Sequence, residues 1–448
     1  MHELGLYDYF MANIQSQWDV IHSMRAQGFH VDKKKKAELT DRFQKTLLEN
    51  EQRLLGSVGF IPNTKSPIDM SKVFEKYGVV PRRTPKTKQP VIDEEALLSY
   101  AQRWPASKEV LTNCVTINQQ RTMLSMYRLM TTDPANFYHA SYDVYKAVTG
   151  RLASEGPDEG HLIPKKRHAG PQMQNQPRMM RAMFIPDNPE LDEITNFDFS
   201  QAEPRIVAWD SNDIFYINAF LAGKSAHKIA ACVIFKGWDT NKGLPLDEVL
   251  DAIQKLCPKC KAAGEQECTH SEYYLAKRCN NGVSYGLQAP RMMQVLRGDN
   301  IFITKDQAEL YVRRILREPI REWQDRTDHE LEKSRWLTNV YGTKREFYGL
   351  RDDTMLRDAL SWKAQSAVTH LTCYAMRAIH QRFTQDKIPA AIKTQTHDSC
   401  TISHRRSDRD LITAIIKEAT YLPVIIHGRE LVIPHETTHG PSWGEQYK

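Results

Sequence analysis

The sequence of 448 residues has no apolar run approaching the length of a membrane-spanning helix, and residues 1–30 lack the pattern of a secretory signal peptide. We also find no internal repeat and no long low-complexity segment. With 41% hydrophobic and 26% charged residues, the composition is that of an ordinary globular protein. We therefore expect a cytoplasmic protein without a membrane partner (in the host cytoplasm if the source is a virus), or an organelle protein whose targeting segment has been removed.

A strong excess of one charge sign is also lacking, since the formal net charge is only +6. Basic residues nevertheless gather in three clusters, at 33–36, 82–88 and 165–168. One such cluster is usually a solvated surface. Three of them in a mildly basic chain slightly favour a polyanionic partner.

Cysteine is scarce as well, with eight in the chain. Five are scattered singly, which fits reduced thiols in a reducing compartment. The others form a Cys257-x-x-Cys260 pair followed by Cys268, with His270 close behind, so that four soft ligands fall within 14 residues. This ligand set is typical of a structural Zn²⁺ site, because such sites close all four positions with protein. The alternative is a chance grouping of reduced cysteines, and a catalytic zinc is disfavoured because no nearby base is evident.

The spacing of apolar residues predicts helices at both ends of the N-terminal third of the chain. Residues 7–55 have apolar positions three and four apart, with a break at 28–32 in which Asp32 is an N-cap candidate. Residues 61–92 are rich in proline, lysine and threonine, which predicts an irregular basic segment. The helical pattern resumes over 93–130.

Strands are predicted further along the chain. Residues 194–199 have the pattern of a buried strand that runs directly into a helix near Pro204, where proline is tolerated in the first turn. Two more strands, 390–396 and 400–402, flank a tight turn at 397–398. Strands among long helices predict an α+β fold.

Two aspartates lie at strand ends, where a rigid sheet can hold a carboxylate in place. These are Asp198 and Asp398. Nucleotidyl transfer requires such carboxylates, because two divalent ions stabilise the attacking and the leaving oxygens, and Mg²⁺ prefers oxygen ligands. Spacing alone does not select this pair, since any of the 55 acidic residues can be a surface charge.

The surrounding residues resemble the motifs of the family A DNA polymerases, the bacterial polymerase I group. The first catalytic motif is matched by 198–205, the second (nucleotide-binding) motif by 277–286, and the third by 395–398. The primer-grasping segment is matched by 149–153 with 174–175, and the C-terminus by 440–445. The resemblance runs from about residue 14 to the end, and five motifs in the right order make it specific. The resemblance also suggests a phage as one source of such a chain.

The resemblance implies a right-hand polymerase fold, with an antiparallel palm sheet and mainly helical fingers and thumb. The implied domains are 1–148 (thumb and N-terminal helices), 149–210 and 346–448 (palm), and 211–345 (fingers). Within the fingers we expect the zinc insertion at 257–270 and the second-motif helix at 273–286.

The resemblance also assigns the site residues. Asp198 and Asp398 hold two Mg²⁺ ions, and Lys277 completes the catalytic set. The expected nucleotide-binding residues are Glu203, Tyr285, Asn281, His227 and Arg278. The expected DNA-binding residues are Arg151, Gln174, Asn175, Arg357, Ser361, Gln365 and His397.

Lys277, Asn281 and Tyr285 of the second motif recur every four residues. Arg357, Ser361 and Gln365, which the resemblance places on a palm helix, have the same spacing. Lys277, Asn281 and Tyr285 therefore share one helix face, where a cation can neutralise triphosphate charge. An ordinary amphipathic surface helix is the alternative. Minor-groove contacts of the DNA-binding set would test base-pair geometry without reading sequence.

Glu203 bears on the choice of sugar. In the family, a glutamate at this position packs beneath the incoming sugar beside the second-motif tyrosine, here Tyr285, and leaves no room for a 2′-hydroxyl. Single-subunit RNA polymerases have a small residue instead. Glu203 therefore favours DNA as the product and makes an RNA polymerase the nearest rival.

The sequence departs from the family pattern at several positions. Asn281 stands where an aromatic residue is usual, Tyr273 replaces an arginine, and Ser399 replaces the glutamate after the third-motif aspartate. The family's Asp-x-His element is reduced to His227. A catalytically inactive, zinc-bearing DNA-binding replication protein is therefore a third alternative.

The expected partners are primer–template DNA and deoxynucleoside triphosphates (dNTPs), with replication accessory proteins as a further class, and we expect a monomer. The chain starts almost at the thumb-like helices, so no proofreading exonuclease is expected in it. A primer-extension assay with deoxy- and ribonucleotides separates the three alternatives.

Overall fold

A computed structural model describes residues 7, 10–11, 14–144, 146–156, 170–262, 268–269, 271–299 and 301–447. The chain forms two compact units. Unit 1 contains 1–39, 126–217 and 319–448, and unit 2 contains 40–125 and 218–318. Among the described residues, no helix combines the length and the apolar character needed to cross a lipid bilayer.

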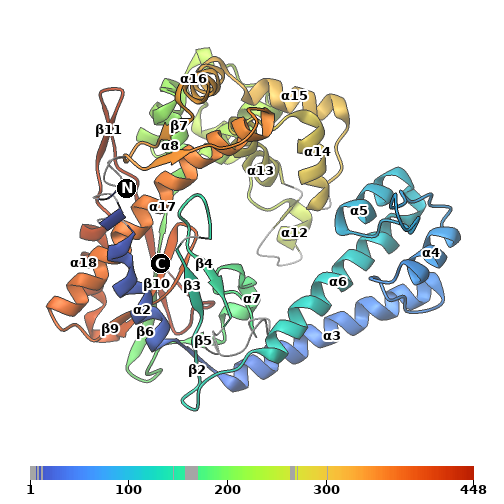
Figure 1. Ribbon diagram of the computed structural model, residues 1–448, viewed down its shortest axis with the longest axis horizontal. Coiled ribbons are helices and arrows are strands. Elements are labelled where there is room, and N and C mark those ends of the chain that lie inside the picture. The colour runs from blue at the N-terminus through green and yellow to red at the C-terminus, as the bar shows by residue number, and fades with distance from the viewer. Residues whose placement is uncertain are drawn as a thin grey trace. The chain divides into compact units, whose positions relative to one another are not determined.

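The centre of unit 1 is a four-stranded antiparallel sheet (Figure 1). Its strands, in spatial order, are β13 (His435–Gly440), β6 (Asp192–Phe199), β10 (Ser399–Arg405) and β9 (Ala390–Thr396). Side chains alternate between the two faces, so Asp198 lies on one face of β6 and Thr195 on the other. The register pairs Asp198 with Ser399, which brings the end of β6 next to the turn between β9 and β10.

Helix α17 (Asp353–Gln385), which is 33 residues long, packs on β9 and β10 and also contacts α8 (Ala202–Asp210) and α18 (Arg409–Ala419). Its N-terminus is capped by Asp352, whose side chain accepts hydrogen bonds from the amides of Thr354 and Met355. The many buried apolar side chains along α17 make it the main helical support of the sheet.

The remaining strands of unit 1 are short. Strands form a three-stranded sheet and three hairpins: β2 (Phe137–Tyr138), β1 (Phe29–Val31) and β5 (Phe184–Ile185); β3 (Ser141–Asp143) with β4 (Ala153–Glu155); β7 (Trp336–Thr338) with β8 (Lys344–Glu346); and β11 (Val424–Ile426) with β12 (Arg429–Leu431). The other α-helices are α2 (Trp18–Gln27), α7 (Arg178–Arg181) and, at the unit boundaries, α9 (Ile214–Leu221) and α16 (Glu318–Ser334).

Unit 2 is helical in its described part. One group of helices encloses a core that includes Leu54, Phe74, Leu97 and Leu111, and its members are α3 (Lys33–Val58, from residue 40), α4 (Pro67–Lys76), α5 (Glu94–Arg103) and α6 (Lys108–Leu129). The others are α10 (Ala226–Phe235), α11 (Asp247–Asp251), α12 (Pro258–Ala262), α13 (Glu272–Ser284), α14 (Ala289–Gly298) and α15 (Lys305–Ile315). Of these, α13 packs closely on α10.

Most sequence-based predictions of secondary structure are confirmed. The strand over 194–199, the helix that follows it and the two strands around the turn at 397–398 are all present. The mixed helix and antiparallel sheet confirm the α+β class. Asp32 caps α3, because its side chain accepts a hydrogen bond from the amide of Lys35 at 2.9 Å.

Two predictions are corrected. The segment 61–92 is not irregular throughout, because α4 forms within it, with Ser66 as the N-cap and Pro67 in the first turn. The second-motif helix, expected over 273–286, is α13, which ends at Ser284 and leaves Tyr285 as its C-cap residue. Tyr285 still donates its amide hydrogen to the carbonyl of Asn281 at 3.1 Å, so the four-residue alignment of these two residues persists.

Candidate active site

Asp198 lies near the end of β6 in the central sheet of unit 1, and Asp398 lies in the adjacent turn between β9 and β10. The amide of Phe199 donates to the carbonyl oxygen of Asp398 at 3.1 Å, and the side chain of Asp198 lies close enough to that of Asp398 to affect its pKa. Burial, with a further contribution from the charge of Glu203, holds the pKa of Asp398 above its ordinary value, against the opposing effect of its hydrogen bonds. Two carboxylates this close cannot both stay ionised without a compensating cation, so the pair fits a divalent metal ion with oxygen ligands.

The backbone next to each aspartate is in a left-handed conformation. His397, directly before Asp398, has φ 56°, and Gln201, three residues after Asp198, has φ 54°. Residues other than glycine rarely adopt this region, and such strain gathers at functional sites. The tight turn at His397 aims Asp398 at the end of β6, while Gln201 starts α8 directly after the strand.

Glu203 lies in the first turn of α8 and forms an ion pair with Arg151, with 2.6 Å between Oε1 and Nη2. Both side chains are about three-quarters buried. The Nε of Arg151 is buried and has no hydrogen-bond partner among the described residues. Arg151, which is predicted to contact DNA, is therefore paired with Glu203, which is predicted to select the sugar.

Gln174 connects the predicted primer-grasping segment to the β9–β10 hairpin. Its Nε2 donates to Oε1 of Gln395 at 3.0 Å, and its Oε1 accepts from the amide of Ser154 at 3.0 Å. Gln395 in turn donates to the carbonyl oxygen of His397. Asn175, the neighbour of Gln174, hydrogen-bonds to Gln172 at 2.6 Å. This chain of amides fixes the hairpin that carries Asp398, a role of Gln395 that the sequence did not reveal.

Arg357, Ser361 and Gln365 recur along one side of α17, as their four-residue spacing predicts, and all three are partly exposed. Arg357 hydrogen-bonds to the hydroxyl of Thr354, and Ser361 donates to the carbonyl oxygen of Asp358, both at 3.1 Å. These bonds are local to the helix, and the three side chains stay partly exposed. DNA contact by these residues stays a prediction.

In unit 2, α13 buries one side and exposes Lys277 and Arg278 on the other. Arg278 forms an ion pair with Asp299, with 2.6 Å between Nε and Oδ2. Gly282 leaves room for Leu287, because a Cβ on Gly282 would lie 2.8 Å from Cδ2 of the leucine side chain. The close approach to this glycine is therefore made by the chain that leaves the helix.

His227 packs against Tyr273, the residue that replaces the family's arginine. The two rings are edge to face at 5.6 Å between centroids, and only 8% of His227 is exposed. Burial, with the charges of Lys277 and Lys255, lowers the pKa of His227 to about 4, so its imidazole is neutral near pH 7. Its Nδ1 is buried and has no partner within the described part of the chain. The charge of Lys277 therefore acts on His227, and a shared nucleotide-binding role of the two residues stays a prediction.

Tyr285 and Glu203 belong to different units, so their predicted meeting beneath the sugar stays a prediction.

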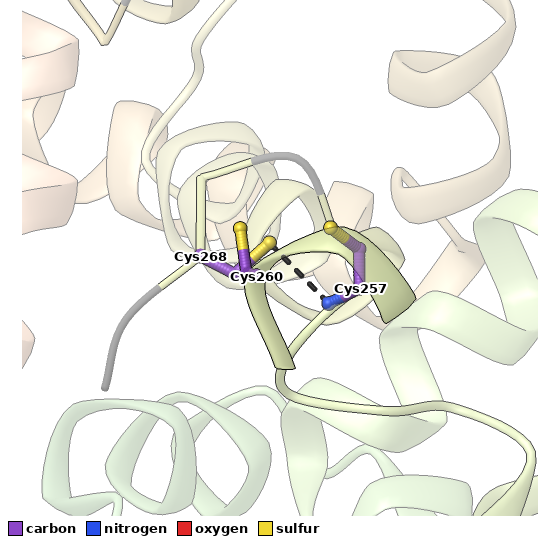
Figure 2. A group of neighbouring side chains, drawn as sticks. All are labelled: Cys257, Cys260 and Cys268. Atoms are coloured by element: carbon purple, nitrogen blue, oxygen red, sulfur yellow. Dashed lines mark hydrogen bonds between the residues drawn. The ribbon is translucent and has the colours of Figure 1, made fainter. Parts of the chain in front are cut away.

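The cysteine motif, by contrast, is brought together within unit 2, as Figure 2 shows. The ligand atoms of Cys257, Cys260 and Cys268 all lie within 4.8 Å of one another. The fourth predicted ligand, His270, and the basic cluster at 165–168 lie outside the described residues.

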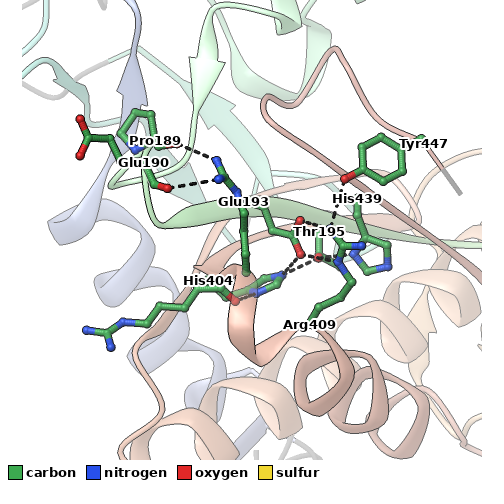
Figure 3. Close-up of polar contacts among 10 residues, drawn as sticks. Pro189, Glu190, Glu193, Thr195, His404, Arg409, His439 and Tyr447 are labelled. Atoms are coloured by element: carbon green, nitrogen blue, oxygen red, sulfur yellow. Dashed lines mark hydrogen bonds and ion pairs between the residues drawn. The ribbon is translucent and has the colours of Figure 1, made fainter.

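A polar cluster on the opposite face of the central sheet was not predicted (Figure 3). It contains Glu193, His404 and His439, one from each of β6, β10 and β13. The hydroxyl of Thr195 bridges the two imidazoles, at 2.6 Å from His404 and 2.8 Å from His439. Arg409 binds both carboxylate oxygens of Glu193. Although the three residues could serve as metal ligands, a guanidinium already neutralises the carboxylate, so the cluster cross-links the strands.

A family model described as DNA polymerase family A matches residues 33–445. The POL domain of Pol1 from M. smegmatis, solved in complex with DNA primer-template and dNTP, superposes with a TM-score of 0.73 at 19% identity and covers 96% of this chain and 70% of that one. The fold is thus that of a polymerase domain. The chain belongs to DNA polymerase family A.

Curated relatives named DNA polymerase I are similar over most of the chain. The one from Treponema pallidum is 22% identical over 436 residues, which are 95% of this chain and 39% of the relative. The one from Helicobacter pylori (strain ATCC 700392 / 26695) is 25% identical over 393 residues, which are 85% of this chain and 38% of the relative. The chain therefore spans about four-tenths of the length of these relatives.

Proposed function

We propose that the chain is a template-directed DNA polymerase that adds deoxynucleotides from dNTPs to a primer 3′-hydroxyl and releases pyrophosphate. The observation that carries the proposal is the proximity of Asp198 and Asp398 at one end of the strands of an antiparallel sheet, in a chain of family A. Nucleotidyl transfer by this route requires two such carboxylates on a rigid support.

The donor set suits Mg²⁺, which takes a few carboxylate oxygens and retains water. Asp198 and Asp398 would hold the ions, which when bound stabilise the attacking 3′-oxygen and the leaving pyrophosphate. The carboxylates themselves supply fixed negative charge, and their support by β6 and the β9–β10 turn keeps that charge in position. Ser399, in place of glutamate, contributes a hydroxyl that donates to the carbonyl oxygen of Thr396 at 2.8 Å.

The other proposed roles follow from position and chemistry. Lys277, exposed on α13, neutralises triphosphate charge, with Arg278 and Asn281 on the same helix and His227 and Tyr285 beside them. Glu203 limits the space beneath the sugar. The DNA-contacting set is Arg151, Gln174, Asn175, Arg357, Ser361, Gln365 and His397.

The remaining expectations are proposals of the same kind. They are the palm, fingers and thumb divisions, a monomer in the cytoplasm, primer–template DNA and dNTPs as partners, and no exonuclease activity in this chain. A phage source stays a prediction. Zinc is the second proposed metal, and three sulfur atoms in unit 2 support it.

Replacing either aspartate tests the proposal. Asp198→Ala and Asp398→Ala should each reduce primer extension by roughly three orders of magnitude, because several kcal/mol of transition-state stabilisation depend on the metal ligands. DNA affinity should change little, since backbone contacts dominate it. Primer extension with dNTPs and fluorescence anisotropy with a labelled duplex measure the two effects.

A matched control is Asp410→Ala, which removes an exposed carboxylate from the same unit and should leave both measurements unchanged. Near-normal extension by either active-site variant would refute the assignment. If the wild-type chain extended primers with ribonucleotides instead, the RNA polymerase alternative would replace the proposal. A wild-type chain that bound duplex and extended with neither nucleotide would indicate an inactive polymerase.

A further inference from the structure

We propose that Cys257, Cys260 and Cys268 bind a structural zinc ion that fixes the N-terminal end of α13. The kinetic part of this inference rests on the proposed role of α13 in dNTP binding. The metal site itself rests only on the three sulfur atoms and their surroundings (Figure 2).

The sulfur atoms have the spacing of a ligand set. They lie within 4.8 Å of one another, and tetrahedral zinc with bonds of about 2.3 Å needs sulfur atoms about 3.8 Å apart. Rotation of the side chains covers the difference. A dithiol redox pair would need only two cysteines and would leave the position of the third without a reason.

The local fold explains how the cysteines meet. Cys257 directly precedes α12 and Cys260 lies one turn further on, so both side chains point to the same side. The amide of Lys261 donates to the carbonyl oxygen of Cys257 at 3.0 Å and closes this turn. Cys268 returns to the same place, where its Sγ accepts a hydrogen bond from the amide of Cys257 at 3.4 Å. Amide donors of this kind orient thiolate ligands and stabilise their charge.

The surroundings suit thiolates bound to a cation. Cys260 and Cys268 are 6% and 5% exposed, in a short segment that otherwise offers little apolar surface to pack. Lys259 and Lys261 are exposed on α12, so two positive charges lie on the helix that carries Cys260. Three thiolates and one Zn²⁺ leave a net charge of −1, which these lysines offset. The sequence places His270 two residues after Cys268, and the proposal stands on the three sulfurs alone.

The chain from Cys268 leads directly into α13. Ser271 is the N-cap of the helix, is buried, and accepts a hydrogen bond from the amide of Tyr274 at 3.1 Å. The first turn is also fixed by an ion pair between Lys236 and Glu272 at 2.9 Å. A metal ion three residues before the cap would fix the direction from which the chain enters the helix. Lys277, less than two turns further on, depends on that direction for its position.

The metal is tested on the full chain, purified without chelators and analysed for metals. We expect about one zinc per chain, and a cobalt-substituted form should show thiolate-to-metal charge-transfer absorbance. Cys257→Ser, Cys260→Ser and Cys268→Ser should each lose most of the zinc. Cys232→Ala, which removes a buried cysteine from α10 in the same unit, should retain it.

Zinc-free wild-type protein, or iron with the visible spectrum of an iron–sulfur cluster, would overturn the zinc assignment. So would a full zinc content in all three serine variants. Circular dichroism melting identifies a variant that has failed to fold. In that case zinc is removed from the wild-type chain by chelation and then added back, which requires no substitution.

The anchoring role has its own measurements. On zinc removal, hydrogen exchange at the first turn of α13, including the amide of Tyr274, should accelerate and should recover when zinc is restored. The KM for dNTP should rise by roughly tenfold, because misplacing a binding group weakens its contacts, while the Kd for duplex DNA stays unchanged. Unchanged exchange and unchanged KM after complete zinc loss would overturn the anchoring role. Metal content and hydrogen exchange need no catalysis, so failure of the polymerase proposal would leave them interpretable.

Discussion

At the scale of single residues, the bond between Glu203 and Arg151 changes how the sugar-selecting role is tested. Glu203 carries a negative charge that is neutralised at 2.6 Å by a guanidinium. Its size and its charge are therefore separate contributions to the site. A substitution that removes both at once does not identify which one excludes the 2′-hydroxyl.

Two substitutions at Glu203 separate these contributions. Glu203→Ala should raise ribonucleotide incorporation by on the order of 100-fold, because removing a steric penalty of a few kcal/mol corresponds to that range. Glu203→Gln keeps the volume, so ribonucleotide exclusion should stay close to that of the wild type. Single-nucleotide incorporation with matched deoxy- and ribonucleotides measures both variants.

Deoxynucleotide incorporation is the internal control, and it should fall less than ribonucleotide incorporation rises in the alanine variant. If Glu203→Ala still excluded ribonucleotides, the steric role would be wrong. If Glu203→Gln lost exclusion as fully as the alanine variant, the charge and its bond to Arg151 would be the deciding feature instead.

The sequence predicted which residues form the candidate site but not which of them bond to each other. Asp198 and Asp398 were found because they end strands within recognisable motifs. The partnership of Arg151 with Glu203 joins residues 52 positions apart, and the bridge from Thr195 to His439 spans 244. Such pairs depend on strand register and on how loops return to the sheet, and neither is determined by local residue pattern.

At the scale of elements, the errors of the sequence-based prediction have local causes. Helix α4 was missed because prolines and lysines dominate 61–92, although Ser66 followed by Pro67 is a typical start of a helix. The strand β1 was missed because three residues are too short for an alternating pattern. Long helices and buried strands were found, because their apolar periodicity extends over several turns or pairs.

The C-terminus of α17 offers a test of local backbone strain. Lys387 follows the C-cap residue Asp386 and has φ 55°. The amide of Ile388 donates to the carbonyl oxygen of Phe383 at 2.9 Å, which is the hydrogen bond expected of a Schellman motif. Glycine suits this position better than lysine, because it has no Cβ.

Lys387→Gly should therefore raise the free energy of unfolding by about 0.5–1 kcal/mol. Lys387→Ala removes the same long side chain but keeps the Cβ, so it should produce no comparable gain. Urea unfolding of the two variants beside the wild type measures the difference. Equal stability of the glycine and alanine variants would show that the left-handed conformation carries no cost at this position.

At the scale of the whole molecule, both units bury histidines in neutral form. Burial lowers the pKa of His227 in unit 2 and of His370 in unit 1 to about 4. The pKa values of His404 and His439, on the strands of the central sheet, are also lowered by burial. In the unfolded chain these imidazoles take up protons near pH 6.5.

The sign of the resulting pH dependence follows from proton binding. Between the two pKa values the unfolded chain binds more protons than the folded one, so stability rises with pH there. The stability contributed by these neutral histidines is fully present above about pH 6.5. It is lost as the pH falls towards their pKa values in the folded state. Burial opposes ionisation of Glu193, but Arg409 lowers its pKa overall. This carboxylate therefore adds a further loss of stability as the pH falls below its ordinary pKa of 4.5.

His370 provides the sharpest test of this dependence. Its ring is stacked on Tyr341 with 5.2 Å between centroids, and Arg377 adds to the lowering of its pKa. His370→Gln removes the titration, so the decline in unfolding free energy between pH 7.5 and 4.5 should be about 2 kcal/mol smaller than in the wild type. The variant should also be less stable at pH 7.5, because the stacked ring is lost.

The control is His329→Gln, which replaces a side chain that is 76% exposed. Its unfolding free energy should decline with pH as that of the wild type does. Urea unfolding at the two pH values measures all three proteins, and an identical decline in His370→Gln and the wild type would show that His370 does not contribute to acid sensitivity.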